Sequence, residues 1–154
     1  MLKFVTATAA ATIAMAGLAC AEDSAFAMQI DARQGIMDYR ALQLGTLGAM
    51  AKGDAEYNAE AAQKAAANLL AATTIDVSML WPKGSDSDSD PSSHALPAIW
   101  ADGSDIGEKD KALVDAVTAM QAAAGGGLDA LKAAMQPIGA ACSGCHKAYR
   151  VSNN

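Results

Sequence analysis

Residues 128–150 have the sequence LDALKAAMQPIGAACSGCHKAYR, and this stretch decides the fold class. Its core-type residues follow one another at alternating intervals of three and four, the spacing of a single helix face. These residues are Leu128, Leu131, Met135, Ile138, Cys142, Cys145 and Tyr149. Pro137 lies inside the pattern and removes one backbone donor, so we expect a kink in this helix.

The composition of the whole chain also favours helices. Of its 154 residues 38 are Ala, while aromatic residues make up only 5%. Ala, Leu, Met, Gln and Lys are good helix formers, whereas a β-sandwich or barrel needs many β-branched and aromatic residues, so an all-β architecture is excluded. Because Ala buries little area, a core this rich in Ala needs another group to fill it.

Three further helices are expected before residue 128. The first spans about 24–51 and ends at Gly53, and the second spans about 55–75 with Asp54 as its cap. The buried face of the first helix is predicted to comprise Phe26, Ile30, Met37, Leu44 and Leu47.

The third expected helix opens at Asp105, with Glu108 three residues later as a capping box, and Gly125, Gly126 and Gly127 end it. Four such helices with short turns predict an all-α, antiparallel four-helix bundle.

The amino terminus has the order of a secretory signal peptide. Lys3 supplies one positive charge, an uncharged and largely apolar run follows to residue 18, and small residues come next. The run is too short for a membrane span. Cleavage after Ala21 is preferred because it keeps the first acidic residues in the mature chain; cleavage after Ala27 is the alternative. We therefore predict a signal peptide at 1–21, one mature domain at 22–154, and a periplasmic location.

Residues 142–146 form the motif C-x-x-C-H, which is the attachment motif of c-type haem. Two thiols form thioethers with the two haem vinyl groups, and the adjacent imidazole of His146 is delivered to the iron. In a helix Cys142, Cys145 and His146 share one face, at i, i+3 and i+4. The sequence predicts one covalent haem c.

Three alternatives compete with haem at this motif. Two cysteines in an exported protein would ordinarily form a disulfide, giving a colourless helical bundle. A thioredoxin-like dithiol would need a preceding strand, which the sequence does not predict. A zinc site would need a second pair of ligands, and His94 alone does not supply it.

A long acidic loop is expected at about 81–103. It holds most of the prolines and the run Ser-Asp-Ser-Asp-Ser-Asp at 85–90. The spacing of Asp86, Asp88 and Asp90 is that of the first ligands in a calcium-binding loop. The glycine and the final glutamate that such a loop requires are missing, so a solvated loop is favoured. His94 is expected at the surface.

The net charge of −6 and pI of about 4.7 argue against nucleic acid as a partner. A redox protein with a basic surface would be complementary to this charge, although the sequence identifies none. No carboxylate pair, nucleophile constellation or phosphate loop indicates catalysis, so an enzyme is not expected.

The chain resembles the class II c-type cytochromes, the group of cytochrome c-prime and its low-spin relatives. The stretches that match are ARQGIM (32–37), LGAMAKGDAEY (47–57), LPAIWAD (96–102) and LKAAMQPIGAACSGCHKAYR (131–150). The resemblance implies a four-helix bundle in which Cys142 and Cys145 are the thioether anchors and His146 is the proximal iron ligand. Many members are homodimers through the first two helices.

The resemblance also implies roles for three polar residues. Arg150 matches a basic residue near the proximal side of the haem, although a basic residue at a helix carboxyl end is equally expected from the helix dipole. Arg33 matches an arginine beside a haem propionate, and a buried-face arginine requires such an anion. Gln34 is expected to share that role.

Met37 matches the position above the distal face of the haem. In low-spin members a Met there binds the iron, which suits electron transfer; in cytochrome c-prime an apolar residue leaves the iron five-coordinate for neutral NO or CO. Met37 could instead fill space in the core. The sequence favours an electron carrier with Met37 as sixth ligand, with the gas-binding form as the alternative.

Overall fold

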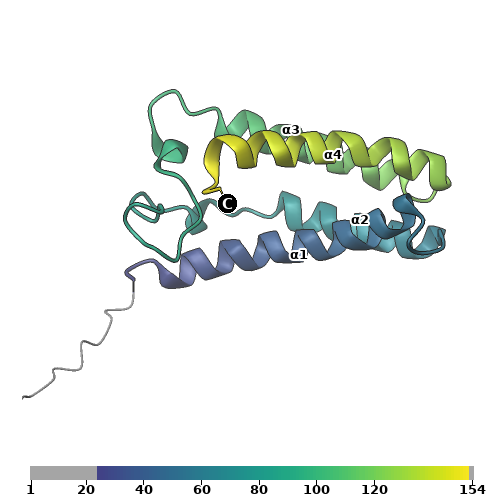
Figure 1. Ribbon diagram of the computed structural model, residues 1–154, viewed down its shortest axis with the longest axis horizontal. Helices are drawn as coiled ribbons and strands as arrows, with labels where there is room; N and C mark the ends of the chain where they lie inside the picture. Colours follow the sequence, from purple (N-terminus) through teal and green to yellow (C-terminus); the bar gives the residue numbers. More distant parts are fainter. Residues whose placement is uncertain (1–23, 153–154) are drawn as a thin grey trace, which may run out of the picture.

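The computed structural model describes residues 24–152, and within them the chain forms an antiparallel four-helix bundle. The helices are α1 (Ala27–Lys52), α2 (Ala59–Thr74), α3 (Ile106–Ala123) and α4 (Leu128–Tyr149). Each packs against its neighbour in the chain, and α1 and α4 close the ring (Figure 1). The predicted all-α bundle is confirmed. The expected signal peptide at 1–21 lies outside the described residues.

The turn between α1 and α2 is only partly as expected. Gly53 ends α1 in the left-handed conformation, with φ of 87°, as predicted. Asp54 does not cap α2, so that prediction was wrong. Asn58 caps it instead, because its extended backbone lets Asn58 Oδ1 accept a 2.9 Å hydrogen bond from the amide of Ala61.

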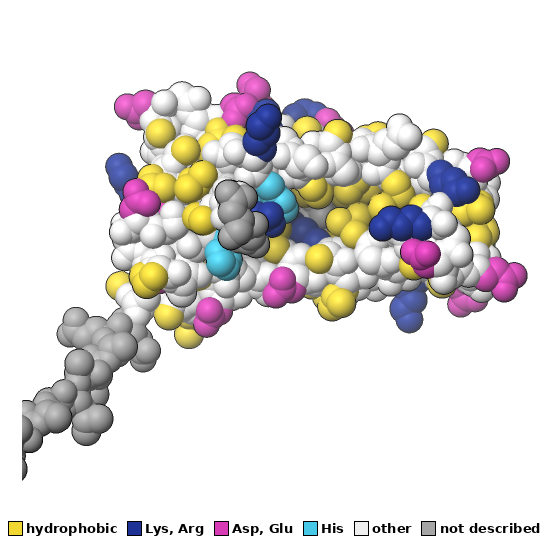
Figure 2. Space-filling view, in the orientation of Figure 1, with side chains coloured by type: hydrophobic (Ala, Val, Ile, Leu, Met, Phe, Trp, Pro, Cys, Tyr) yellow, Lys and Arg dark blue, Asp and Glu magenta, His cyan; other side chains and the backbone are white. Residues whose placement is uncertain are grey.

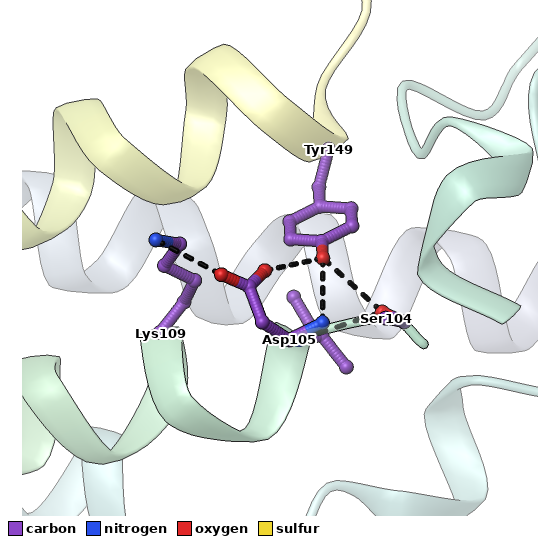
Figure 3. Close-up of polar contacts among 5 residues, drawn as sticks. Ser104, Asp105, Lys109 and Tyr149 are labelled. Carbon is purple, nitrogen blue, oxygen red and sulfur yellow. Dashed lines mark hydrogen bonds and ion pairs between the residues drawn. The ribbon is translucent and has the colours of Figure 1, made fainter. Parts of the chain in front are cut away.

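The predicted capping box at the start of α3 is also wrong. Asp105 is the residue before the helix, but its carboxylate makes no capping hydrogen bond. It binds Tyr149 of α4 and Lys109 instead (Figure 3). The tertiary contact with Tyr149 thus takes the place of the local motif.

The buried apolar core occupies one half of the bundle. In α1 its buried members are Leu47 and Met50, and in α4 they are Leu131 and Ile138. Helices α2 and α3 contribute Leu69 and Met120, among others. The residues of α1 before Leu47 and of α4 after Ile138 contribute no buried member to this cluster. Nearer the long loop the buried side chains, among them Ile30, Arg33, Arg40 and Tyr149, lie outside this cluster.

The connection between α2 and α3 forms the loop at one end of the bundle (Figure 1). It contains two short 3-10 helices, Ser78–Leu80 and Pro97–Trp100. A single antiparallel bridge joins Ala95 to Arg150, and the amide of Val151 donates to the carbonyl of His94. The loop is thus fixed to the carboxyl end of α4. Among the described helices, none combines the length and the apolar character needed to cross a membrane.

Candidate haem site

The C-x-x-C-H motif lies in the last turns of α4, and its three functional side chains are half-buried. Both thiols are free of disulfide bonds, so the disulfide alternative is not realised. Burial raises the pKa of Cys142, against the opposing charge of Arg40, and burial also raises the pKa of Cys145. A redox dithiol needs a lowered thiol pKa, so these environments do not favour that alternative.

The surroundings of His146 favour the protonation state that binds metals. Burial lowers the pKa of its imidazole, and the positive charge of Arg150 lowers it further. Both effects favour neutral imidazole, which is the ligand form for iron. His146 could therefore ligate a metal on the same helix face as the two thiols.

The face of the molecule shown in Figure 2 has a hollow between the α1–α2 pair and the α3–α4 pair. Hydrophobic side chains line this hollow and the histidines lie beside one end of it. Cys142 and His146 belong to the part of α4 that contributes nothing fully buried to the core cluster. Two free thiols, a neutral imidazole and an incompletely filled interior together fit a covalently attached porphyrin.

The register of α1 against α4 follows from one contact. A Cβ atom on Gly48 of α1 would lie 3.8 Å from Met135 Cε of α4. Met37 precedes Gly48 by 48 − 37 = 11 residues, and His146 follows Met135 by 146 − 135 = 11. Eleven residues make about three helical turns and about 16.5 Å, so in straight antiparallel helices Met37 would reach the level of His146 on the equivalent face.

Met37, which the sequence predicted on the buried face of α1, is more exposed than expected. Its side chain is 41% exposed. Its sulfur accepts a 3.5 Å hydrogen bond from Arg40 Nη1. The thioether is therefore fixed by a neighbour on α1 and still accessible.

Arg40 is a site residue that the sequence reasoning missed. It is only 7% exposed, and both Nε and Nη2 donate to the carbonyl of Ala72, at 3.1 and 2.9 Å. Burial lowers its pKa, while Asp110 and Cys142 act in the opposite direction. Its position could have been found, because Arg33, Met37, Arg40 and Leu44 continue the spacing of four, three and four along α1.

Arg33 is buried as predicted, and its neighbours in the structure belong to the loop. Nη1 donates to Ser85 Oγ at 2.6 Å and to the carbonyl of Leu80, while Nη2 donates to the Ser85 carbonyl and to Ser93 Oγ. The guanidinium also lies 4.6 Å from the ring centroid of Trp81. Its expected contact with a propionate stays a prediction, and all four Nη hydrogens already have acceptors in the loop.

Gln34 and Arg150 lie near the same end of the bundle, Gln34 half-buried and Arg150 exposed. Gln34 Nε2 donates to the carbonyl of Ser92 at 2.8 Å, so it also fastens the loop. The backbone of Arg150 pairs with Ala95, and its charge acts on His146. Their predicted roles beside the haem remain predictions.

The acidic loop is more ordered than a solvated segment. Asp88 is exposed, but Asp86 and Asp90 are buried, at 8% and 6% exposure. Burial acts to raise the pKa of Asp86, but hydrogen bonds from Ser89 and Asp88 outweigh it and lower that pKa. Residues 24–152 contain no group of His, Cys, Asp and Glu suited to a metal, so the calcium alternative gains no support. His94 is exposed, as predicted.

A four-helix bundle that presents C-x-x-C-H on its last helix, beside an incompletely filled interior, defines a c-type cytochrome of the bundle class. A family model described as Cytochrome C' matches residues 28–150. The chain belongs to the cytochrome c' family, and it is a monohaem c-type cytochrome with one covalent haem c.

Individual relatives agree with this assignment. The chain is 46% identical over 121 residues to cytochrome c-554 of Cereibacter sphaeroides, covering 79% of each protein. The solved cytochrome c' of Rhodobacter sphaeroides superposes with a TM-score of 0.79 at 37% identity, covering 82% of this chain and 97% of that one. A ferrous variant of the Alcaligenes xylosoxidans cytochrome c' with bound NO superposes at 0.70, with 28% identity and coverage of 81% and 94%.

Proposed function

We propose that this cytochrome is a periplasmic electron carrier in which Cys142 and Cys145 anchor the haem, and His146 and Met37 are its axial ligands. The observation that carries the proposal is the register between α1 and α4, which brings Met37 to the level of His146 on the facing helix. The similarity to cytochrome c-554 is compatible with it.

The haem iron would supply a one-electron couple. His146 would remain neutral through its burial and through the charge of Arg150, and would bind iron without a competing proton. A thioether ligand favours the reduced state and keeps the coordination shell similar in both oxidation states, which suits rapid electron transfer. The residues of the bundle would exclude water from most of the ring.

An optical experiment tests the sixth ligand. The ferric holoprotein is expected to show a low-spin spectrum with a sulfur-to-iron charge-transfer band, and Met37→Ala is expected to abolish the band. Met28→Ala is the matched control, because Met28 lies on the same helix and is 81% exposed. A high-spin ferric spectrum that Met37→Ala leaves unaltered would refute Met37 ligation.

The second candidate function is reversible binding of NO or CO at five-coordinate iron. It is favoured by the match to the Cytochrome C' family model and by the NO-bound relative. The hydrogen bond from Arg40 to Met37 also supports it, because this bond engages the sulfur. In this case ferrous wild-type protein would bind CO as tightly as the Met37→Ala variant does.

We also propose that the protein forms a homodimer through the outer face of α1 and α2. Tyr39, Leu42 and Ile75 are exposed there, and a groove of about 340 Å³ runs between the helices beside Gly35 and Ala72. Small residues let a second copy approach closely, and exposed apolar side chains favour association. Sedimentation of the holoprotein should give a dimer that Leu42→Glu converts to monomer. Met79→Glu, which changes an exposed residue outside both helices, should not.

We also propose that the signal peptide is cleaved after Ala21 and that the protein is exported to the periplasm. The Phe26 ring lies against Gly84, with Cε2 3.7 Å from a Cβ placed there, so the segment before Ala27 contributes to the fold. Mass spectrometry of the exported protein should give a chain that begins at Glu22. A chain that begins at Met28 would refute this site.

A further inference from the structure

We propose that Arg40 makes the distal side of this haem site selective for small anionic ligands over neutral ones. Arg40 is then a specificity-determining residue. The inference rests on the proposed orientation of the haem, with Met37 above the face opposite His146. It does not require Met37 to bind the iron.

Arg40 lies against the residue proposed for the distal side of the haem. Its Nη1 lies 3.5 Å from Met37 Sδ, and its charge is close enough to Cys142 to oppose the rise in that thiol's pKa. The guanidinium therefore lies beside the proposed distal residue, in direct contact with its sulfur. Any ligand that takes the place of the Met37 sulfur would meet this cation.

The positive charge of Arg40 has no charged hydrogen-bond partner among the described residues. All three nitrogens of Arg40 bond to neutral acceptors: Nε and Nη2 to the Ala72 carbonyl and Nη1 to the Met37 thioether. Within residues 24–152 no carboxylate forms an ion pair with it. Asp110, an exposed residue of α3, acts on it only at longer range. A buried cation with neutral partners is better stabilised when an anion joins it.

The hydrogen bond from Arg40 to Met37 is one that an anion could improve on. Nη1 carries a proton toward Met37 Sδ, and sulfur is a weak acceptor. An anionic atom at that place would accept a hydrogen bond in which both partners are charged, and this bond is stronger than one to a neutral thioether. Neutral NO or CO gains little from the same donor. The chemical class selected is therefore a small monoanion such as azide or nitrite.

The test compares ligands in a protein whose sixth position is open. In the Met37→Ala holoprotein, azide is titrated against the ferric form and CO against the ferrous form, with visible spectra as the readout. Adding Arg40→Gln should weaken azide binding about tenfold or more and leave CO affinity within about twofold. Adding Arg40→Lys, which retains a positive charge, should preserve most of the azide affinity.

Equal losses for azide and CO would show a general structural effect and overturn the proposal, as would unchanged azide affinity in the Gln variant. Arg40→Met, an uncharged side chain of similar length, replaces Gln if that variant does not fold. Failure of Met37 ligation is seen separately, in the wild-type ferric spectrum, and leaves the Arg40 comparison in the Met37→Ala protein intact.

Discussion

The hydroxyl of Tyr149, in the last turn of α4, donates a 2.5 Å hydrogen bond to Asp105 Oδ1 at the start of α3 (Figure 3). The same hydroxyl accepts hydrogen bonds from the Asp105 amide and from Ser104 Oγ. Asp105 Oδ2 lies 3.1 Å from Lys109 Nζ. The helix that carries the haem motif is therefore tied to α3 by one phenol, three residues after His146.

Removing that phenol oxygen should weaken the bundle. Tyr149→Phe keeps the buried ring but leaves the Asp105 amide without its acceptor, so the free energy of unfolding should fall by about 1 kcal/mol. Urea unfolding of the holoprotein measures the change. Thr118→Val is the control, because it removes an exposed hydroxyl of α3 whose hydrogen bond to the Val114 carbonyl lies within that helix. Equal stability of the two variants would contradict the prediction.

Asp105 should make stability depend on pH in the acid range. The hydrogen bond from Tyr149, and next the one from Lys109, lower the pKa of this carboxyl below its ordinary value of 3.8. A lowered folded-state pKa favours the ionised form. The resulting stability is present above the unfolded-state pKa and is lost as the pH falls through the folded-state pKa.

The Asp105→Asn variant tests this effect. Its unfolding free energy should lie below that of wild type by a constant amount near neutral pH, and the gap should close as the pH drops below about 4. A gap that stays constant to the most acidic pH at which the holoprotein is folded would show that the carboxylate charge is not involved.

Arg33 should control the order of the long loop. Its guanidinium bonds to Leu80, Ser85 and Ser93 at once, so Arg33→Met should expose the backbone around Ser85 and Ser93 to solvent. Hydrogen exchange of these amides should accelerate, while that of the α2 amides should not. Gln34→Ala, which removes only one exposed hydrogen bond to the same loop, should have a much smaller effect.

The cysteines should determine how well the bundle packs. The buried core cluster ends at Leu47 in α1 and at Ile138 in α4, so the half that contains Cys142 and Cys145 depends on the haem for bulk. The Cys142→Ala/Cys145→Ala variant should lose covalent haem and melt well below the holoprotein. The half of the bundle next to the α2–α3 loop should lose hydrogen-exchange protection first. A colourless variant that melts at the holoprotein temperature would refute this dependence.

Much of the site could be predicted from local patterns. The C-x-x-C-H motif and the stripe from Leu128 to Tyr149 depend only on helix periodicity, and α4 forms over that stretch. Gly53 was correctly predicted to end α1, because a left-handed residue is a local requirement. The bundle class, its haem and the burial of Arg33 followed from the same sequence features and from the family resemblance.

The errors lie where distant residues compete with a local motif. Asp105 and Glu108 have the sequence of a capping box, but Tyr149, 44 residues away, binds the aspartate more favourably. Asp86 and Asp90 suggested a solvated loop, yet the loop is drawn inward because Arg33 binds Ser85 across 52 residues. Such preferences are invisible in a single window of sequence.

The sequence by itself determined the helices, the attachment motif and the need for a large group in an Ala-rich interior, because side-chain volume and helical period are local properties. Only the tertiary structure decided which residues meet across the bundle. The approach of Gly48 to Met135 sets the level of Met37 against His146, and the packing of α1 on α2 brings Arg40 to the carbonyl of Ala72. The register of two helices depends on the contacts between them, so it cannot be read from the sequence of either helix alone.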